Sequence, residues 1–207
     1  MIFSKNPHTR AKSIFNLIAP IYSALDSYVK KGFRRAMHNV KNEHDLDGKS
    51  VLDIGSGSGA WAALFKEYGA SKVHGVDFAR KMIVRANRRY APEITFSIGD
   101  AENLSEFEDG SFDIVTASFV LHGVKEDTRK IILNEMKRIS KQHVIINDYY
   151  GPTPAVARFL EYLEKSDYHH FKVNFIHELK NQFAHVKREE ASFGTSVYFA
   201  SKKSGVY

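Results

Sequence analysis

The sequence predicts an α/β fold with an open, mostly parallel sheet that carries helices on both faces. Short apolar runs alternate with amphipathic helical segments between residue 50 and about residue 147, and the first of these runs ends in a glycine-rich turn. This alternation is typical of βαβ units, in which ligands bind above the carboxyl ends of the strands. We therefore expect the functional residues at that edge of the sheet.

The expected elements follow the chain in order. Apolar residues recur at helical spacing from residue 11 to residue 40, with a break at Pro20, which predicts an N-terminal helical arm in two pieces. Strands are expected over residues 51–54, 72–77, 94–99, 112–118 and 143–147, and helices over residues 60–66, 79–90 and 127–140. After Gly151 we expect a helix over residues 153–165, an aromatic stretch over 168–171, a helical segment near 175–183, and a terminal hairpin of strands 185–193 and 195–200.

Length and composition favour one domain, in which a helical arm over residues 1–45 packs as a lid on a main body over residues 46–207. Hydrophobic residues make up 43% and charged residues 26% of the chain, which disfavours both a disordered and a membrane protein. The apolar runs are too short to span a membrane, and the first residues lack the apolar stretch of a signal peptide. We therefore expect a cytoplasmic protein, monomeric or homodimeric.

The absence of cysteine excludes disulfides, thiolate metal sites and cysteine nucleophiles, and no metal is expected. The net charge of +6 could suit nucleic acid, an anionic metabolite or a membrane surface. Because the basic residues occur in short groups dispersed along the chain, a solvated basic surface is the favoured interpretation. DNA is not an expected partner, and RNA is a less favoured one.

The glycine-rich turn predicts a nucleotide-type site. Gly55, Gly57 and Gly59 allow a ligand to approach the backbone closely, and the amide groups at the start of the next helix would face that ligand. The spacing of Gly55, Gly57 and Ala60, with Asp77 about 20 residues further on as a ribose ligand, also fits a dinucleotide-binding enzyme. The turn alone leaves both interpretations open.

Three carboxylates at the ends of successive strands favour a cationic cofactor. Asp53 precedes the glycine turn, where its charge would repel a pyrophosphate and attract a cation such as the sulfonium and ammonium groups of S-adenosylmethionine. Asp77 can accept hydrogen bonds from both ribose hydroxyls, and Asp100 can accept one from the adenine amine. Phe78 and Met82 offer apolar surface to the faces of the purine. Any one aspartate alone could be a helix cap, but three in register are difficult to explain as caps.

Five motifs carry a likeness to a known family, at residues 51–59, 75–82, 99–104, 109–115 and 118–122. With them the chain resembles the class I S-adenosylmethionine-dependent methyltransferases, in the group that includes the ubiquinone and menaquinone biosynthesis C-methyltransferases. The resemblance implies a Rossmann-like seven-stranded sheet in the order 3-2-1-4-5-7-6 with one antiparallel strand. It also implies that S-adenosyl-L-methionine is converted to S-adenosyl-L-homocysteine, with further cofactor contacts at Ser56, Gly99, Ala101 and Ser118.

The acceptor of the methyl group is expected above residues 118–122 and after Tyr149. Methyl transfer from a sulfonium is an in-line displacement, so a base is needed only when the nucleophile carries a proton. His122 and Tyr149 are the candidates for orienting the acceptor or acting as base, although His122 could equally be a packed histidine. Tyr22, Phe119 and Tyr150 are candidates for substrate contacts, but Tyr149 and Tyr150 alternate sides, so at most one of these two should face the pocket.

Several chemistry-bearing residues have a structural interpretation instead. We expect Trp61 to pack in the core or under the lid, and Asp113 to play a structural role. Asp148 could contact the substrate or cap a turn. A metal site at the adjacent His169 and His170 is disfavoured because neighbouring side chains diverge.

The leading function is therefore methylation of a small molecule. An RNA or protein methyltransferase is the alternative, motivated by the basic charge, and a non-catalytic S-adenosylmethionine-binding protein is a remote one. A nicotinamide-dependent oxidoreductase would bind NAD in preference to S-adenosylmethionine, which a binding measurement distinguishes.

Overall fold

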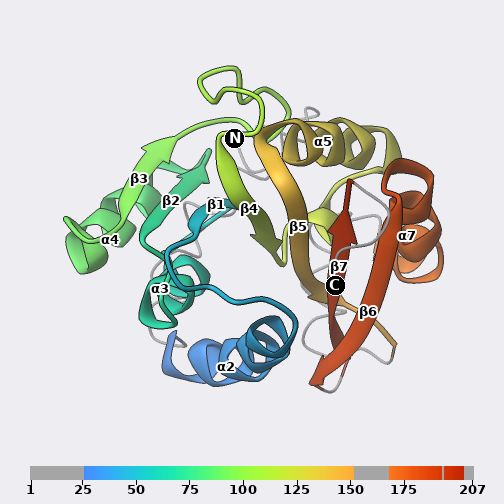
Figure 1. The fold of residues 1–207 in the computed structure, drawn as a ribbon, viewed down its shortest axis with the longest axis horizontal. Helices are drawn as coiled ribbons and strands as arrows, with labels where there is room; N and C mark the ends of the chain where they lie inside the picture. Colours follow the sequence, from blue (N-terminus) through green and yellow to red (C-terminus); the bar gives the residue numbers. More distant parts are fainter. Residues whose placement is uncertain (1–25, 152–167, 193, 203–207) are drawn as a thin grey trace, which may run out of the picture.

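A seven-stranded sheet in the order β3-β2-β1-β4-β5-β7-β6 forms the centre of the molecule (Figure 1). The computed structural model describes residues 26–151, 168–192 and 194–202. Strands β1 to β5 run parallel, and β7 runs antiparallel to both of its neighbours, β5 and β6. The fold class, the strand order and the single antiparallel strand are all confirmed.

The strands and helices have bounds close to those expected. The strands are β1 Ser50–Ile54, β2 Lys72–Asp77, β3 Thr95–Ile98, β4 Phe112–Ser118, β5 Ser140–Tyr149, β6 His185–Ser192 and β7 Thr195–Ser201. The helices are α2 Asp26–Glu43, α3 Ala60–Glu67, α4 Arg80–Tyr90, α5 Glu126–Ile139 and α7 Tyr168–Gln182, with a short 3-10 turn, η1, at Leu121–Gly123.

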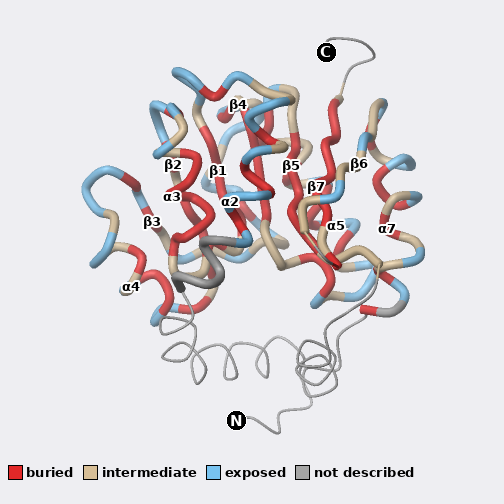
Figure 2. The backbone as a smooth tube through the Cα atoms, turned by 90° about the horizontal axis from the view of Figure 1, so that it is seen from below, coloured by how far each residue is buried: buried red, intermediate tan, exposed pale blue. Residues whose placement is uncertain are grey.

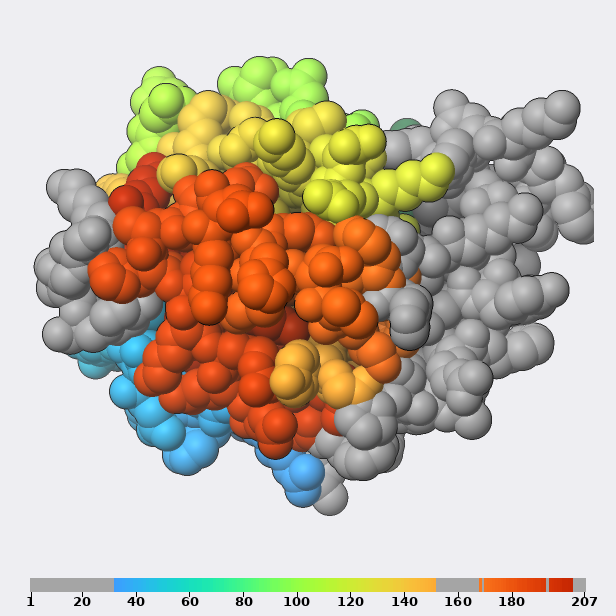
Figure 3. All heavy atoms as spheres, turned by 90° about the vertical axis from the view of Figure 1, so that its right-hand side faces the viewer, coloured from blue at the N-terminus to red at the C-terminus, as the bar shows by residue number. Residues whose placement is uncertain are grey.

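Two hydrophobic cores lie on the two faces of the sheet, because successive strand residues point to opposite faces. Val51 of β1 packs with the cluster that includes α2, α3 and α4, whereas its neighbour Leu52 packs with the cluster that includes α5 and α7. The central strands are buried, while the outer strand β6 is half-buried (Figure 2). Figure 3 looks onto the side of the molecule where α7 lies against both α5 and β6.

Helix α2 packs against α3 and β6 through buried Ala36, Met37 and Val40. Residues 1–25, which contain the expected break at Pro20, lie outside the described residues, as does the expected helix over residues 153–165. The lid role of the N-terminal arm stays a prediction. No helix in the described part of the chain is long and apolar enough to cross a membrane.

Two element boundaries differ from the sequence-based expectation. The aromatic stretch at residues 168–171 is the first turn of α7, because the apolar stripe of Phe171, Phe175 and Leu179 continues through it without a break. Strand β5 begins at Ser140, immediately after α5, and pairs there with Phe112. The helix thus includes a stretch that the sequence set apart by its aromatic rings, and the strand includes the polar residues 140–142, which the sequence assigned to no strand.

Candidate functional site

The glycine turn lies against the segment that follows β4. Gly55 has a φ of 70°, a left-handed conformation that favours glycine, and a Cβ added there would lie 2.4 Å from Cγ2 of Val120. Val120 immediately precedes η1, which carries His122. The predicted cofactor side and the predicted acceptor side therefore meet at one edge of the sheet, at the carboxyl ends of β1 and β4.

Asp77 joins the glycine turn to the end of β2. Its Oδ2 accepts a hydrogen bond from the Gly57 amide at 2.9 Å, and its Oδ1 accepts one from the Ala79 amide at 2.7 Å. Burial raises the pKa of this carboxyl, and the two amides oppose that shift. Since each carboxylate oxygen has two lone pairs, both oxygens retain acceptor capacity for the hydroxyls of a ribose.

Asp53 is the most unusual group at the site. It is fully buried, and neither of its carboxylate oxygens has a hydrogen-bond partner among the described residues. Burial and then the nearby charge of Asp77 raise the pKa of Asp53 well above its usual range, while the Ala62 amide opposes this shift without reaching hydrogen-bonding geometry. A buried carboxylate without donors is costly unless a cation compensates it. The hydroxyl of Ser56 is likewise buried without a partner among these residues.

The residues expected to hold an adenine lie around the ends of β2 and β3. Met82 is buried and packs with Ala79 and Phe78, at the start of α4. Asp100 is exposed, and its Oδ1 accepts a hydrogen bond from the Glu102 amide at 3.1 Å. An apolar patch beside an exposed carboxylate suits a purine ring with an exocyclic amine.

Gly99, Ala101 and Ser118 lie at the same edge of the sheet. A Cβ at Gly99 would lie 2.5 Å from Cγ1 of Val76, so the backbone there approaches β2 more closely than a larger residue allows. Ser118, the last residue of β4, accepts a hydrogen bond from the side-chain amide of Asn147 at 2.9 Å. All the residues predicted from the glycine turn and the strand ends are thus at the carboxyl edge of β1 to β4.

On the acceptor side, His122 forms a pair with Asp148. Nδ1 of His122 lies 2.7 Å from Oδ1 of Asp148, and both residues are buried. Asp148 also accepts hydrogen bonds from the amides of Leu121, His122 and Tyr149. The two interpretations that the sequence left for Asp148 were a cap and a substrate contact, and the structure supports the cap and adds the contact to His122.

Aromatic rings from the segment after β4, from β5 and from α7 lie around His122 of this pair. The rings of Phe119, His122, Tyr149 and Tyr168, which we call the aromatic cluster, include centroid distances of 4.7 Å between His122 and Tyr149 and 5.1 Å between Tyr149 and Tyr168. Phe119 has a φ of 53°, an uncommon conformation for a bulky residue, and its ring also stacks on Phe33 of α2. The cluster offers flat apolar surfaces beside a histidine.

A buried ion pair fixes the turn that carries His122. The guanidinium of Arg129 in α5 donates to both carboxylate oxygens of Glu178 in α7, at 2.8 and 2.9 Å. Nη1 of Arg129 donates to the carbonyl oxygens of Leu121 and Val124, at the two ends of η1. Arg129 is fully buried, so these partners must compensate the free-energy cost of removing its charge from water.

One predicted substrate residue, Tyr150, is not part of the aromatic cluster. The guanidinium of Arg188 lies 3.5 Å from the ring centroid of Tyr150, which places that ring against β6 and away from Tyr149. Tyr149 is the one of the two tyrosines that belongs to the aromatic cluster, and the expectation that at most one of them faces the acceptor pocket stays a prediction. Tyr22 lies outside the described residues.

Trp61 and Asp113 have the structural roles expected of them. Trp61 is buried and donates its indole N–H to the hydroxyl of Thr116 at 2.9 Å. Burial alone would raise the pKa of Asp113, but the Lys141 ammonium and hydrogen bonds from Ser50 hold it well below its usual range.

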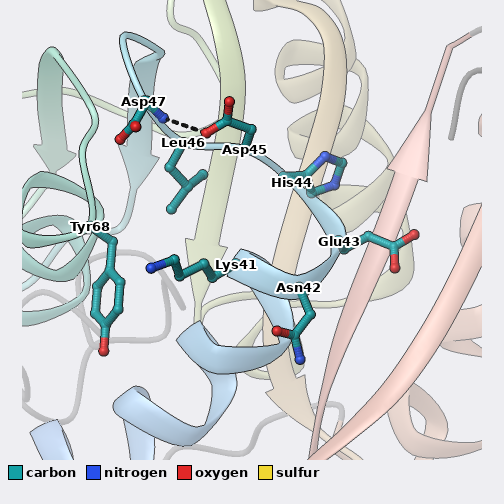
Figure 4. Close-up of a pocket in the computed structure, with 8 residues that line it drawn as sticks. All are labelled: Lys41, Asn42, Glu43, His44, Asp45, Leu46, Asp47 and Tyr68. Atoms are coloured by element: carbon teal, nitrogen blue, oxygen red, sulfur yellow. Dashed lines mark hydrogen bonds between the residues drawn. The ribbon is translucent and has the colours of Figure 1, made fainter.

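Two other features at first suggest binding sites. A cavity of about 300 Å³ lies at the amino ends of the strands, where the end of α2 and the loop before β1 face Tyr68 (Figure 4). It contains none of the predicted site residues. Glu126, His170 and Glu178 bring possible metal-ligand atoms within 4.8 Å of one another, but Arg129 already occupies both oxygens of Glu178. A cation there would compete with the guanidinium.

The sequence did not single out Arg129 or Glu178, and for the aromatic stretch that contains Tyr168 it favoured packing over a substrate contact. A signal for the first two was available: Arg129 lies three, four and seven residues before the apolar residues Ile132, Leu133 and Met136 of α5, so it belongs to the buried stripe. Glu178 lies in the stripe of α7 in the same way, three residues after Phe175 and next to Leu179. A charged residue inside an apolar stripe requires a partner, and here each supplies the other.

Comparison with known proteins places this geometry in a family. The family described as "Methyltransferase domain" matches residues 51–143. The chain is 31% identical over 186 residues to the 2-phytyl-1,4-naphtoquinone methyltransferase of Nostoc punctiforme, an alignment that covers 84% of this chain and 79% of that protein. The chain belongs to the class I S-adenosylmethionine-dependent methyltransferases, in the UbiE-like group. The predicted family and cofactor are therefore confirmed.

A second relative of this group aligns over less of its length, and one solved methyltransferase structure superposes over nearly all of its chain. The chain is 32% identical over 160 residues to the demethylmenaquinone methyltransferase of Paenarthrobacter aurescens, covering 74% of this chain and 61% of that protein. Among solved structures, magnesium protoporphyrin IX methyltransferase from Synechocystis PCC 6803 with bound SAM superposes with a TM-score of 0.72 at 19% identity, covering 97% of this chain and 99% of that one. At 19% identity, the similarity to this solved structure supports the fold alone.

Proposed function

We propose that the chain transfers a methyl group from S-adenosylmethionine to a small-molecule acceptor by in-line displacement. The observation that carries the proposal is the carboxylate of Asp53 beneath the glycine turn, which is buried and has no hydrogen-bond partner in the described part of the chain. S-adenosylmethionine brings a sulfonium and an ammonium group and no phosphate, so it compensates this charge where a pyrophosphate would be repelled.

Each part of the cofactor has residues suited to it. The backbone of Gly55, Gly57 and Gly59 would receive the methionine portion, with Asp53 as the compensating charge. Asp77 would accept hydrogen bonds from the ribose hydroxyls, and Asp100 would accept one from the adenine amine. Ser56, Phe78, Met82, Gly99, Ala101 and Ser118 complete the proposed cofactor residues.

When bound, the cofactor supplies an electrophilic methyl group on a positively charged sulfur. Because charge is dispersed in this displacement, the protein contributes mainly by holding the acceptor in line and by excluding water. His122, Tyr149 and Phe119 are the residues we propose for orienting the acceptor, since all three belong to the aromatic cluster.

The acceptor we propose is an aromatic hydroquinone, such as a reduced naphthoquinone. The stacked and edge-on rings of the aromatic cluster favour a flat, apolar molecule. The Nostoc and Paenarthrobacter relatives are named for the methylation of a naphthoquinone and of demethylmenaquinone, which supports an acceptor of the quinone class.

Methylation of RNA is a second candidate, favoured by one observation. Helix α4, which begins at the cofactor edge of the sheet, exposes Arg80 and Lys81 in its first turn and Arg88 and Arg89 in its last turn, and residues 78–92 contain no acidic side chain. Such a surface could contact phosphates.

A labelled-methyl experiment tests the proposal. The chain is incubated with isotopically labelled S-adenosylmethionine and, in parallel, with 1,4-dihydroxynaphthalene under reducing conditions, a metabolite extract, and bulk RNA. We expect label in the naphthalene product or in a small aromatic metabolite, detected by mass spectrometry, at a rate that changes little with salt. Label only in RNA, with a rate that falls steeply as salt rises, would support the second candidate instead.

A further inference from the structure

Asp148 receives more hydrogen bonds than a simple cap needs. Its two carboxylate oxygens accept from three backbone amides, those of Leu121, His122 and Tyr149, and they contact Nδ1 of His122. Four contacts fill the acceptor positions of a carboxylate. Asp148 thus connects the end of β5 to the turn after β4 and to the ring of His122.

This arrangement determines which nitrogen of His122 carries a proton. A carboxylate that accepts from three amides is an acceptor, so its contact with Nδ1 requires a proton on Nδ1. In the neutral imidazole the basic lone pair then belongs to Nε2. The ring is fixed in position as well as in tautomer, because it packs edge-on against Tyr149 and Tyr168.

We propose that Asp148 is a positioning residue that holds His122 as the general base for a hydroxyl of the acceptor. The inference rests on the proposed function and deepens it: the preferred acceptor carries a proton that must leave, as a hydroquinone does. The buried pair of Arg129 and Glu178 contributes by holding the two ends of η1, so that His122 has little freedom to move.

Among the described residues, the charged and titratable groups around His122 come from β5, α5 and α7. Asp148 and Tyr149 come from β5, Arg129 from α5, and Tyr168 from α7. Glu178 and then His170, both of α7, extend the same network. Asp148 lies 2.7 Å from Nδ1 of the imidazole, so we expect it to set the tautomer.

The proposed step balances as follows for a hydroquinone. The hydroxyl proton passes to Nε2 of His122, and the electron pair it leaves moves through the ring, so that the adjacent carbon forms the new bond to the methyl carbon. The carbon–sulfur bond breaks, and its electron pair stays on sulfur, which becomes a neutral thioether. The hydrogen on the methylated carbon is then lost to water as His122 returns its proton to the oxygen, which restores the aromatic ring with a net release of one proton.

Nuclear magnetic resonance of the histidine side chains in the full chain tests the tautomer without any acceptor. We expect His122 to carry its proton on Nδ1 in the wild type, and Asp148→Asn to shift the population toward the Nε2 tautomer. Asp113→Asn, a change at the other end of the sheet, should leave the resonance unmoved. A wild-type His122 protonated on Nε2 overturns the proposal whether or not methyl transfer is detected.

Kinetics with 1,4-dihydroxynaphthalene as probe test the role in catalysis. Asp148→Asn should lower kcat by about 10²- to 10⁴-fold, the usual contribution of a general base, and change the pH profile of kcat, while the affinity for S-adenosylhomocysteine stays within about twofold. The diether 1,4-dimethoxynaphthalene, which has no hydroxyl proton, should not be methylated. If Asp148→Asn does not fold, His122→Gln is measured instead, because it leaves Asp148 its three backbone donors.

The outcomes separate this inference from the proposed function. Unchanged kcat and pH profile in a folded Asp148→Asn or His122→Gln variant overturn the positioning role while methyl transfer itself stands. Failure of the wild type to bind S-adenosylhomocysteine overturns the proposed function. In that case the His122 tautomer measured by nuclear magnetic resonance still shows whether Asp148 holds the imidazole ring.

Discussion

Asp53 places a negative charge where none of the described residues donates a hydrogen bond to it. Its pKa is raised by burial and by Asp77, so the folded chain binds the Asp53 proton more tightly than the unfolded chain does. The contribution of this group to stability is therefore fully present below its unfolded pKa and is lost as pH rises through the folded pKa. At neutral pH, Asp53 costs stability in the free protein and favours a cationic ligand.

Asp53→Asn should therefore act in opposite directions on stability and on binding. We expect the free protein to gain about 1–3 kcal/mol at pH 7, because an unpartnered buried charge is removed, and to unfold at a temperature several degrees higher. Affinity for S-adenosylmethionine should fall about tenfold or more. Thermal unfolding and titration calorimetry measure the two effects, and a variant that loses stability and keeps its affinity would show that Asp53 is an ordinary core residue.

Asp77→Ala should weaken cofactor binding more simply. It removes the acceptor proposed for the ribose and also the contacts to Gly57 and Ala79, so we expect the dissociation constant to rise about 10- to 100-fold. Asp113→Ala, which removes a partly buried aspartate from the opposite end of the sheet, is the matched control: it should lower stability and leave affinity nearly unchanged. Equal affinity in Asp77→Ala and wild type would place the ribose elsewhere.

At the scale of elements, α5, α7 and η1 form one unit through Arg129 and Glu178. Breaking a buried ion pair from one side leaves an uncompensated charge, which typically costs about 3–5 kcal/mol. We expect that loss in urea unfolding of Arg129→Met, and recovery of most of it in the double variant Arg129→Met with Glu178→Leu. A single variant as stable as the wild type would contradict a buried pair that holds η1.

The helices and strands were largely predictable from sequence, because the signals that define each of them lie within its own segment of the chain. Strands such as β1 and β4 are short apolar runs bounded by turn residues, and the five parallel strands follow from their alternation with helices. The shared location of Asp53, Asp77 and Asp100 was predictable as well, because each lies at or beside the end of a strand and parallel strands end at one edge of the sheet.

The pairing of His122 with Asp148 could not be read in the same way. The two residues are 26 positions apart, and they meet because β4 and β5 pair in parallel with Ser118 opposite Asn147. The register between two strands depends on how the whole sheet packs, so the hydrophobic pattern of β4 or β5 alone does not predict which residues lie opposite each other. The start of α7 was missed for a related reason: its first turn is aromatic and histidine-rich, and only the continuing stripe to Phe175 identifies it as helix.

At the scale of the whole molecule, the carboxyl and amino ends of the strands carry different kinds of residues. The carboxyl ends carry the predicted functional residues, while the amino ends hold a contact between two half-buried histidines, His44 after α2 and His143 of β5, with ring centroids 4.6 Å apart. Burial, followed by the neighbouring His143, lowers the pKa of His44 to about 4. Burial also lowers the pKa of His143 itself.

Acid should therefore loosen the docking of α2. Because His44 binds its proton less tightly when folded, the stability it contributes is lost as pH falls from the unfolded value of 6.5 toward about 4. We expect the unfolding temperature of His44→Gln to fall less steeply than that of the wild type over this range, whereas His177→Gln, at an exposed position of α7, should follow the wild type. Equal slopes for His44→Gln and wild type would contradict the burial argument.

Titration calorimetry with S-adenosylmethionine, S-adenosylhomocysteine and NAD tests the central claim most directly, because the glycine turn alone fits both cofactor classes and Asp53 decides between them. The account predicts saturable binding of S-adenosylmethionine and S-adenosylhomocysteine to the wild-type chain, weakened by Asp53→Asn, and no comparable binding of NAD. Binding of NAD alone would contradict it.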